Sequence, residues 1–264
     1  MRCHRWLEAS ALAAALACTH AQAAQPAPRV VQVQPSGPEV PANLLRISIR
    51  FAAPVAGPLL PRLSLRRADG RAIEAPFLEQ ELWSPNGKVL TIMFHPGRVK
   101  SGLNARDAMG PILSMREDVA LALDGRPIKH WSVGASDEIG PVPSAWKVSD
   151  VRVDSRQLLV VTLDAPIDGR DADHVAIADA QNHRVPGHAR LTNGESTWTF
   201  TPNVPWRTGG YRLVARGTLE DAAGNRLGGH FETSIDSPPG DAADAVVAFT
   251  VDSSRRPNHA PVHR

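Results

Sequence analysis

Two stretches of this chain are versions of one another, and this internal repeat limits the folds available more than any other feature. Thr91-Ile92-Met93-Phe94-His95-Pro96 and Thr197-Trp198-Thr199-Phe200-Thr201-Pro202 both read T-x-x-F-x-P. An Asn-Gly pair precedes each copy, at Asn86-Gly87 and at Asn193-Gly194. The copies are about 106 residues apart, which is the size of a domain and too long for a solenoid repeat. The chain of 264 residues is therefore expected to contain two related domains.

The repeated segments have the pattern of half-buried strands. Leu45, Ile47, Ile49 and Phe51 alternate with Arg46, Ser48 and Arg50, and Leu90, Ile92, Phe94, Trp198 and Phe200 also alternate with polar or smaller residues. Period-2 alternation indicates one face in the core and one face in water. The Asn-Gly pairs, with Asp69-Gly70 and Asp124-Gly125, are typical hairpin turns. We expect an all-β protein built from antiparallel sandwiches, with a helical turn only near 104–108 and a last strand at 246–251.

The N-terminus resembles a secretory signal. A short basic segment precedes the apolar run 9–17, and Ala21-Gln22-Ala23 is an A-x-A cleavage site, so the exported chain would begin at Ala24. The alternative is a lipoprotein acylated at Cys18, which Leu16 disfavours because lipoprotein signals usually carry a small residue there. Cys3 and Cys18 both lie inside the signal, so the exported chain would have no disulfide and no thiolate metal site.

Charge argues against nucleic acid as a partner. The net charge is +2, to which residues 1–23 contribute +1 and 253–264 contribute +3, so the body is close to −2. Binding to nucleic acid needs a strong basic face. No later apolar run approaches the roughly 20 residues that span a bilayer. The expected divisions are a signal peptide at 1–23, a first domain at 24–136, a linker at 137–145, a second domain at 146–252 and a disordered tail at 253–264.

The second repeat resembles a known family. Trp198-x-Phe200-x-Pro202, then Gly209-Gly210-Tyr211, then Asp221-Ala222-Ala223-Gly224-Asn225 resemble the bacterial immunoglobulin-like (Ig-like) domain of surface-layer and other exported proteins. The likeness covers most of 146–235, and residues 30–134 resemble the family more loosely. It implies two tandem Ig-like antiparallel β-sandwiches and no particular function. We expect Tyr211 to form a tyrosine corner, and Asp221 with Asn225 to fix a loop.

Candidates for chemistry are few, and each also has a structural explanation. Ser144-Ala145-Trp146-Lys147 fits S-x-x-K, but it lies where linker becomes strand. The acidic run Asp164, Asp168, Asp171 and Asp173 could be a Ca²⁺ site or a solvated loop. Asp221 with Asn225 could be a metal site or a turn. His183 and His188 form no H-E-x-x-H motif. We favour the structural explanation in each case, and expect no catalytic residue, no metal and no cofactor.

The expected function is therefore that of a non-catalytic exported protein, a structural or protein-interaction module of the periplasm, cell surface or exterior. Its partner would be a cell-envelope protein or a polysaccharide. The alternative is a carbohydrate-binding or cell-wall accessory protein that uses the loop tryptophans Trp83, Trp146 and Trp206. A hydrolase is the third hypothesis.

Overall fold

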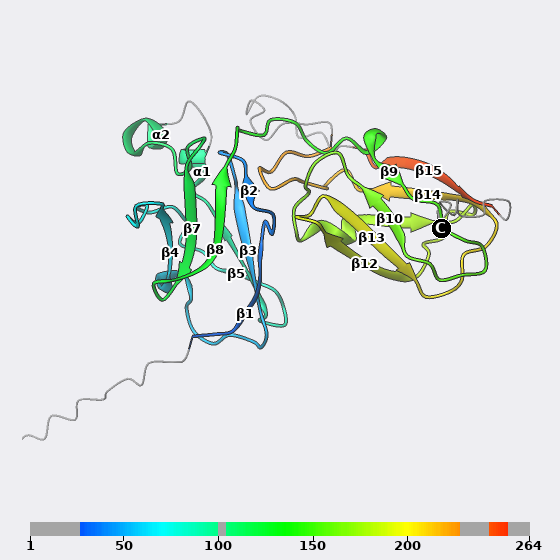
Figure 1. Cartoon of the computed structure of the whole chain (residues 1–264), viewed down its shortest axis with the longest axis horizontal. Coiled ribbons are helices and arrows are strands. Elements are labelled where there is room, and N and C mark those ends of the chain that lie inside the picture. The colour runs from blue at the N-terminus through cyan, green and yellow to red at the C-terminus, as the bar shows by residue number, and fades with distance from the viewer. Residues whose placement is uncertain (1–26, 100–103, 228–242, 253–264) are drawn as a thin grey trace, which may run out of the picture.

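The computed structural model describes residues 27–99, 104–227 and 243–252. The expected signal peptide, its cleavage site, the Cys18 alternative and the tail 253–264 lie outside the described residues. Two β-rich units follow each other along the longest axis of the molecule (Figure 1). Among the described residues the α-helices are limited to two short ones, α1 (Pro96–Val99) and α2 (Asn104–Met109), and both belong to the first unit. The all-β expectation is confirmed, as is the helical turn near 104–108.

The first unit is a sandwich of two four-stranded sheets. One sheet has the order β1-β3-β6-β5 and the other β2-β8-β7-β4. All pairs are antiparallel except β2 with β8, which is parallel. The core between the sheets is formed by aliphatic residues with Phe51, Phe94 and Trp131. The strands are β1 (Val30–Gln34), β2 (Glu39–Val40), β3 (Arg46–Phe51), β4 (Leu63–Arg67), β5 (Leu82–Trp83), β6 (Val89–Met93), β7 (Asp118–Leu123) and β8 (Arg126–Val133), with a 3₁₀ turn η1 (Leu60–Arg62).

The second unit has a four-stranded and a three-stranded sheet, with the orders β12-β13-β10-β9 and β11-β14-β15. Its core contains Trp198, Phe200, Trp206 and Tyr211. The strands are β9 (Lys147–Val148), β10 (Leu159–Thr162), β11 (Val175–Ala178), β12 (Gly187–Thr192), β13 (Thr197–Pro202), β14 (Gly209–Ala215) and β15 (Ala245–Val251), with 3₁₀ turns η2 (Pro143–Ala145) and η3 (Asp171–His174).

The strand order in both units is that of an Ig fold. If the strands of the second unit are lettered A to G in chain order, the sheets are A-B-E-D and C-F-G, the constant-type arrangement. The first unit has the same order with one addition, because β2 follows strand A and pairs with the last strand, β8. The first T-x-x-F-x-P segment overlaps the end of β6 and the second coincides with β13, and these two strands both occupy position E. The repeat in the sequence therefore corresponds to equivalent strands.

Local expectations from the sequence hold at the turns. Asn193 and Gly194 both have positive φ, at 52° and 62°, between β12 and β13. The hydroxyl of Tyr211 accepts a hydrogen bond from Arg207 N and donates one to Arg207 O, both at 3.1 Å. This is the tyrosine corner that the resemblance implied. Asp221 Oδ1 accepts a hydrogen bond from Asn225 N at 2.9 Å, and Gly224 has φ 88°, as expected for a fixed loop.

One expectation about β3 is wrong. Alternation placed Arg46 and Ser48 on a wet face, but both are buried, and only Arg50 of these three polar residues is exposed. Ser48 Oγ and Thr91 Oγ1 share a hydrogen bond at 3.0 Å on that face, and Arg46 binds carboxylates of the second unit. The face that the sequence assigned to water is covered by the second sandwich.

Candidate functional site

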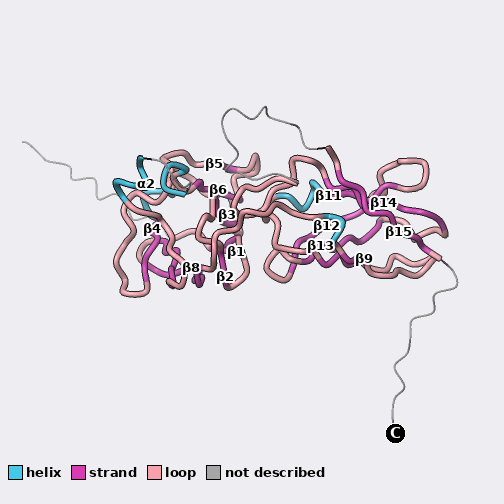
Figure 2. The backbone as a smooth tube through the Cα atoms, turned by 90° about the horizontal axis from the view of Figure 1, so that it is seen from above, coloured by secondary structure: helices cyan, strands magenta, loops and turns pink. Residues whose placement is uncertain are grey.

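The most distinctive site in the molecule is the junction between the two sandwiches. Three connections from one end of the second unit reach it: B–C with Asp168 and Gly169, D–E with Glu195, and F–G with Glu220 to Asn225. Figure 2 shows β1 and β3 of the first unit beside this end of the second. In antibody variable domains the B–C and F–G loops of this end carry the antigen site. Here the same end is used to bind the first sandwich.

Arg46 lies at the centre of the junction. Its Nε donates to Asp168 Oδ2 and its Nη2 donates to Glu220 Oε2. Arg46 is only 8% exposed and Asp168 only 5%. Two further arginines complete the network from the solvent side, because Arg170 Nε lies 3.1 Å from Asp168 Oδ1 and Arg226 Nε lies 3.0 Å from Glu220 Oε1.

The electrostatics keep Arg46 and Asp168 charged at neutral pH. Burial alone would lower the pKa of Arg46, but attraction to Asp168 and Glu220 outweighs burial and raises that pKa above its ordinary value. For Asp168 burial acts to raise the pKa, and the charges of Arg46 and Arg170 overcome it, so the pKa is lowered. Such a buried pair is costly to break, because removal of one partner strands the other charge.

A set of amide hydrogen bonds forms a second part of the junction. Asn225 Nδ2 donates to Asp221 Oδ2 at 2.8 Å and to the carbonyl of Asp137 at 2.9 Å. Asn43 of the first unit donates its Nδ2 to the same carbonyl at 2.7 Å, and Asp137 N donates back to Asn43 Oδ1 at 2.8 Å. The expected linker is thus tied to both sandwiches. Leu45 N also donates to Ala222 O at 3.0 Å.

Asp221 is the most perturbed acid at this place. Burial raises its pKa to about 6, although its hydrogen bonds with Asn225 act in the opposite direction. The folded state therefore holds this proton more tightly than the unfolded chain does. The resulting contribution to stability is complete below the unfolded pKa, close to 4, and is lost as pH rises through about 6.

The D–E turn provides the third contact. Glu195 Oε2 accepts a hydrogen bond from Ser36 N at 2.7 Å, and Gln34 Nε2 donates to Gly169 O at 3.3 Å. Glu195 is buried and has a positive φ of 64°, so its backbone is held in a conformation that few non-glycine residues adopt. The second Asn-Gly turn is therefore part of the junction as well as a hairpin.

A hollow of about 350 Å³ opens beside the junction. Trp83, Arg50 and Gln34 from the first unit and Arg170 from the second contribute to its lining. Trp83 is half-buried against Phe51, with ring centroids 6.0 Å apart, and its Nε1 donates to Glu81 Oε2 at 2.8 Å. A fixed indole and two arginine side chains in one lining suit a polar ligand that carries negative charge.

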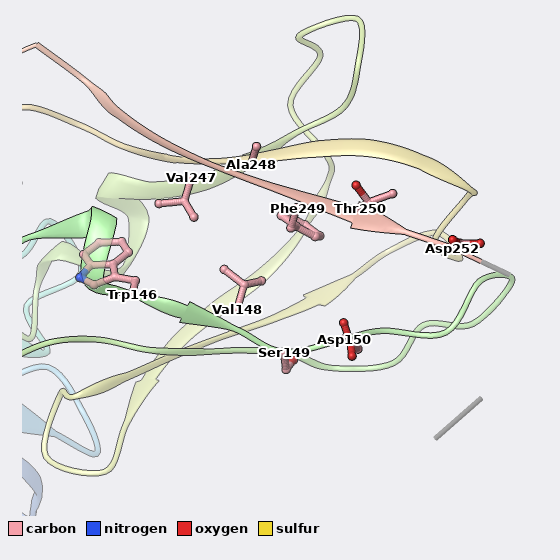
Figure 3. A pocket seen from close by; sticks show the side chains of 9 residues that line it. All are labelled: Trp146, Val148, Ser149, Asp150, Val247, Ala248, Phe249, Thr250 and Asp252. Atoms are coloured by element: carbon pink, nitrogen blue, oxygen red, sulfur yellow. The ribbon is translucent and has the colours of Figure 1, made fainter. Parts of the chain in front are cut away.

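A second hollow lies on the lateral side of the second unit. It encloses about 380 Å³ between β9 and β15, and Figure 3 shows it from close by. Trp146 lies at one end, Asp150 and Asp252 lie at the other, and Val247 and Phe249 are on the side of β15 toward Val148.

The acidic residues noted in the sequence are mostly engaged in structure. Asp164 accepts hydrogen bonds from Val142 N and from Trp146 Nε1, the latter at 2.7 Å. Asp171 Oδ2 accepts one from Glu220 N at 2.9 Å, and burial raises the pKa of Asp171. Only Asp173 of the run is exposed without such a role. The structure does not bring the run together as a metal site, and across 27–99, 104–227 and 243–252 no three potential ligands are grouped for a metal.

The other candidates are also separated from one another. Ser144 lies in η2 and Lys147 in β9, so they do not share a helix face. His183 and His188 are both exposed, and His183 N donates to Asp179 Oδ1 at 2.8 Å. Neither pair forms a catalytic arrangement.

The tryptophans do not form an exposed line. Trp146 and Trp206 are buried, and Trp83 alone of the three is partly accessible. Trp206 Nε1 donates to Gln157 O at 2.8 Å. No sequence pattern pointed to the ion pair between Arg46 and Glu220 at the junction, because the two residues lie 174 positions apart.

No helix in the described part of the chain is long and apolar enough to cross a membrane. The sequence matches no protein-family model and no curated protein. The solved structures that match this chain are distant. One is a biofilm-associated protein, BSP domain, at 10% identity and TM-score 0.26, with 86% of this chain and 30% of that chain covered.

A second is the N-terminal part of the bacterial S-layer protein SbsC, at 11% identity and TM-score 0.26, with 86% of this chain and 44% of that chain covered. A third is a three-Ig fragment of titin, at 10% identity and TM-score 0.22, with 85% of this chain and 63% of that chain covered. This chain thus spans less than a third of the biofilm protein and less than half of the S-layer fragment.

Proposed function

We propose that this chain is an exported, non-catalytic Ig-like protein of the cell envelope that acts as a structural or protein-interaction module. The observation that carries the proposal is the junction, where the buried Arg46 network and the Asn225 hydrogen bonds hold the two sandwiches in one arrangement. A fixed pair of Ig-like units is suited to present its sides to partners or to act as a spacer. Export is supported by Ala21-Gln22-Ala23 after an apolar run.

Support for the non-catalytic part comes from how the acids are used. Asp168 pairs with Arg46, Asp171 holds the Glu220 backbone, and Asp221 holds Asn225. Each perturbed carboxyl of the second unit therefore has a structural contact that explains its burial. An enzyme would need such groups to converge on a hollow with a second acid or base.

The test is hydrolase profiling of the purified exported protein, with and without divalent metals. We expect no turnover of any substrate class. Turnover that is abolished by Asp171→Asn or by His183→Ala, while Asp173→Asn keeps it, would replace this proposal with a hydrolase. Fractionation of cells with intact-mass measurement tests the location, with an envelope protein that begins at Ala24 as the expected result.

The hollow at Trp83 favours a second candidate, binding of an acidic polysaccharide. The test is quenching of tryptophan fluorescence by polysaccharides with and without carboxylate groups. Arg50→Ala should weaken a saturable signal while it keeps the indole reporter, and Arg126→Ala, an exposed arginine of the first unit, is the matched control. Equal effects of the two variants would remove this candidate.

A further inference from the structure

The two sandwiches differ at the edge of the sheet that ends in the last strand. In the first unit β2 pairs in parallel with β8, with Glu39 opposite Ser132 and Val40 opposite Val133. In the second unit β15 takes the place of β8, and it pairs with β14. Within the described residues no strand takes the place of β2 there. An uncovered edge presents unpaired N–H and C=O groups to any extended chain.

The place of the missing strand is the hollow between β9 and β15. Trp146 and Val148 form one wall, and Val247 and Phe249 form the other (Figure 3). Both walls are held in place. Trp146 is fixed through Asp164, and the ring of Phe249 stacks on Tyr211 with centroids 5.5 Å apart. The groove thus combines these apolar side chains with polar groups, among them Ser149 and Thr250, and its preformed walls lower the entropy lost when a ligand is ordered in it.

The edge strand itself lacks the features that usually protect such edges. β15 has the sequence AVVAFTV, with no charge and no proline in seven residues, and Val246 is 55% exposed. Native edges are normally protected by lysine, proline or a bulge. Charge appears only at the end of the groove, where Asp150 and Asp252 both line it and are exposed.

We propose that this groove docks an extended segment of a partner protein, which adds to the sheet as a strand parallel to β15. Its alternate apolar side chains contact Val148, Val247 and Phe249. Lys or Arg residues at its C-terminal end lie beside Asp150 and Asp252. The parallel direction is taken from the pairing of β2 with β8 in the first unit, and the basic end is chosen to complement the carboxylates of Asp150 and Asp252. The inference rests on the proposed interaction role and adds to it a site and a class of partner.

A second copy of the chain is a poorer occupant. Two copies of β15 related by a two-fold axis pair antiparallel, and a pairing centred on Ala248 places Asp244 of one copy opposite Asp252 of the other. Like charges directly opposite each other destabilise a strand pair. The acidic ends of β15 thus act against self-pairing and favour a strand with basic residues.

The test uses a labelled probe peptide of alternating Val or Ile with Thr or Ser that ends in two lysines, added to the full exported chain at low salt. Fluorescence anisotropy measures affinity, and hydrogen exchange measures protection of the β15 amides. Control peptides carry two glutamates at the end, or the two lysines at the start, or a central proline. We expect binding of the first peptide only, with slower exchange in 245–251.

Charge-swap variants test the groove. Asp150→Lys with Asp252→Lys should weaken the lysine-ended peptide about fivefold or more, as expected for two exposed ion pairs at low salt, and should allow the glutamate-ended peptide to bind. Asp118→Lys, an exposed aspartate of the first unit, is the matched control and should change neither affinity.

Four outcomes would overturn the docking proposal. These are no binding at millimolar peptide, protection outside β15, dimers of the free chain that Ala248→Pro abolishes, and peptide binding only after residues 253–264 are removed. The third identifies a second copy as the occupant, and the fourth identifies the chain's own tail. Absence of peptide binding without turnover leaves the proposed function in place, whereas turnover refutes that function whatever the peptide does.

Discussion

Replacement of Arg46 by alanine tests the junction most directly. The change leaves the buried carboxylate of Asp168 and the partly buried carboxylate of Glu220 without their shared cation. Removal of one partner from a buried pair costs about 3–5 kcal/mol. Each carboxylate keeps one arginine, since Arg170 contacts Asp168 and Arg226 contacts Glu220. We therefore expect a loss of about 3 kcal/mol of unfolding free energy, at the lower end of that range.

The assay is urea unfolding followed by tryptophan fluorescence, because buried tryptophans report on both cores. Chains with two domains often depart from a two-state transition. We expect one transition in the wild type, because the junction couples the units, and two separate transitions in Arg46→Ala. Arg46→Met should cost about as much as alanine, since the stranded charges and not the lost volume dominate.

The matched control is Arg226→Ala, which removes a mostly exposed arginine from the same network and should cost no more than about 1 kcal/mol. The cost of Arg46→Ala should also shrink as pH falls below about 4, because the lowered pKa of Asp168 supplies stability that is lost as this carboxyl becomes protonated. If Arg46→Ala costs no more than Arg226→Ala at neutral pH, the junction does not depend on this charge.

Three further predictions concern other parts of the same structure. Burial raises the pKa of Asp221 to about 6, so the wild type loses stability relative to Asp221→Asn as pH rises from 4 to 7, by up to about 3 kcal/mol. A difference in urea midpoints that stays constant over this pH range would contradict this. Trp198→Ala and Trp206→Ala should each cost about 3–5 kcal/mol by calorimetry, since the side chains are 0% and 1% exposed; a small effect at Trp198 would refute its place in the core. Asn225→Ala should speed protease cleavage near Asp137, whose carbonyl it binds, and equal digestion rates would show that the linker is held by other contacts.

The sequence predicted the elements that depend on local chemistry. The strands at Leu45–Phe51 and Thr197–Pro202, the turn at Asn193-Gly194 and the tyrosine corner follow from patterns within a few residues. Alternation reports which face of a strand is apolar, and it cannot report that another domain covers the polar face. This is why Arg46 was placed in water.

The burial of Trp206 escaped the sequence for a related reason. Its position near a turn placed it among the loop tryptophans that could bind a carbohydrate, but it is 1% exposed. The chain folds this turn inward, however, and Trp206 contacts Phe200, Tyr211 and Phe249 with centroid distances between 5.3 and 6.2 Å. Phe249 belongs to the last strand, so no local pattern links the two residues. Contacts across the fold decide the burial of an aromatic residue next to a turn.

Divergence between the two copies of one fold indicates where recognition is available. The first copy closes its last connection with the short Asp124-Gly125 hairpin, whereas the second extends it through Asp221 and Asn225 to bind the first unit. That extension occupies the loop end where antibody domains recognise their ligands. The first copy also covers its last strand with β2, and the described part of the second has no such cover on β15. Within its described residues the second copy has thus used the loops of one end for the junction and kept an open lateral edge, so a partner of the second unit is expected to meet β15 and not those loops.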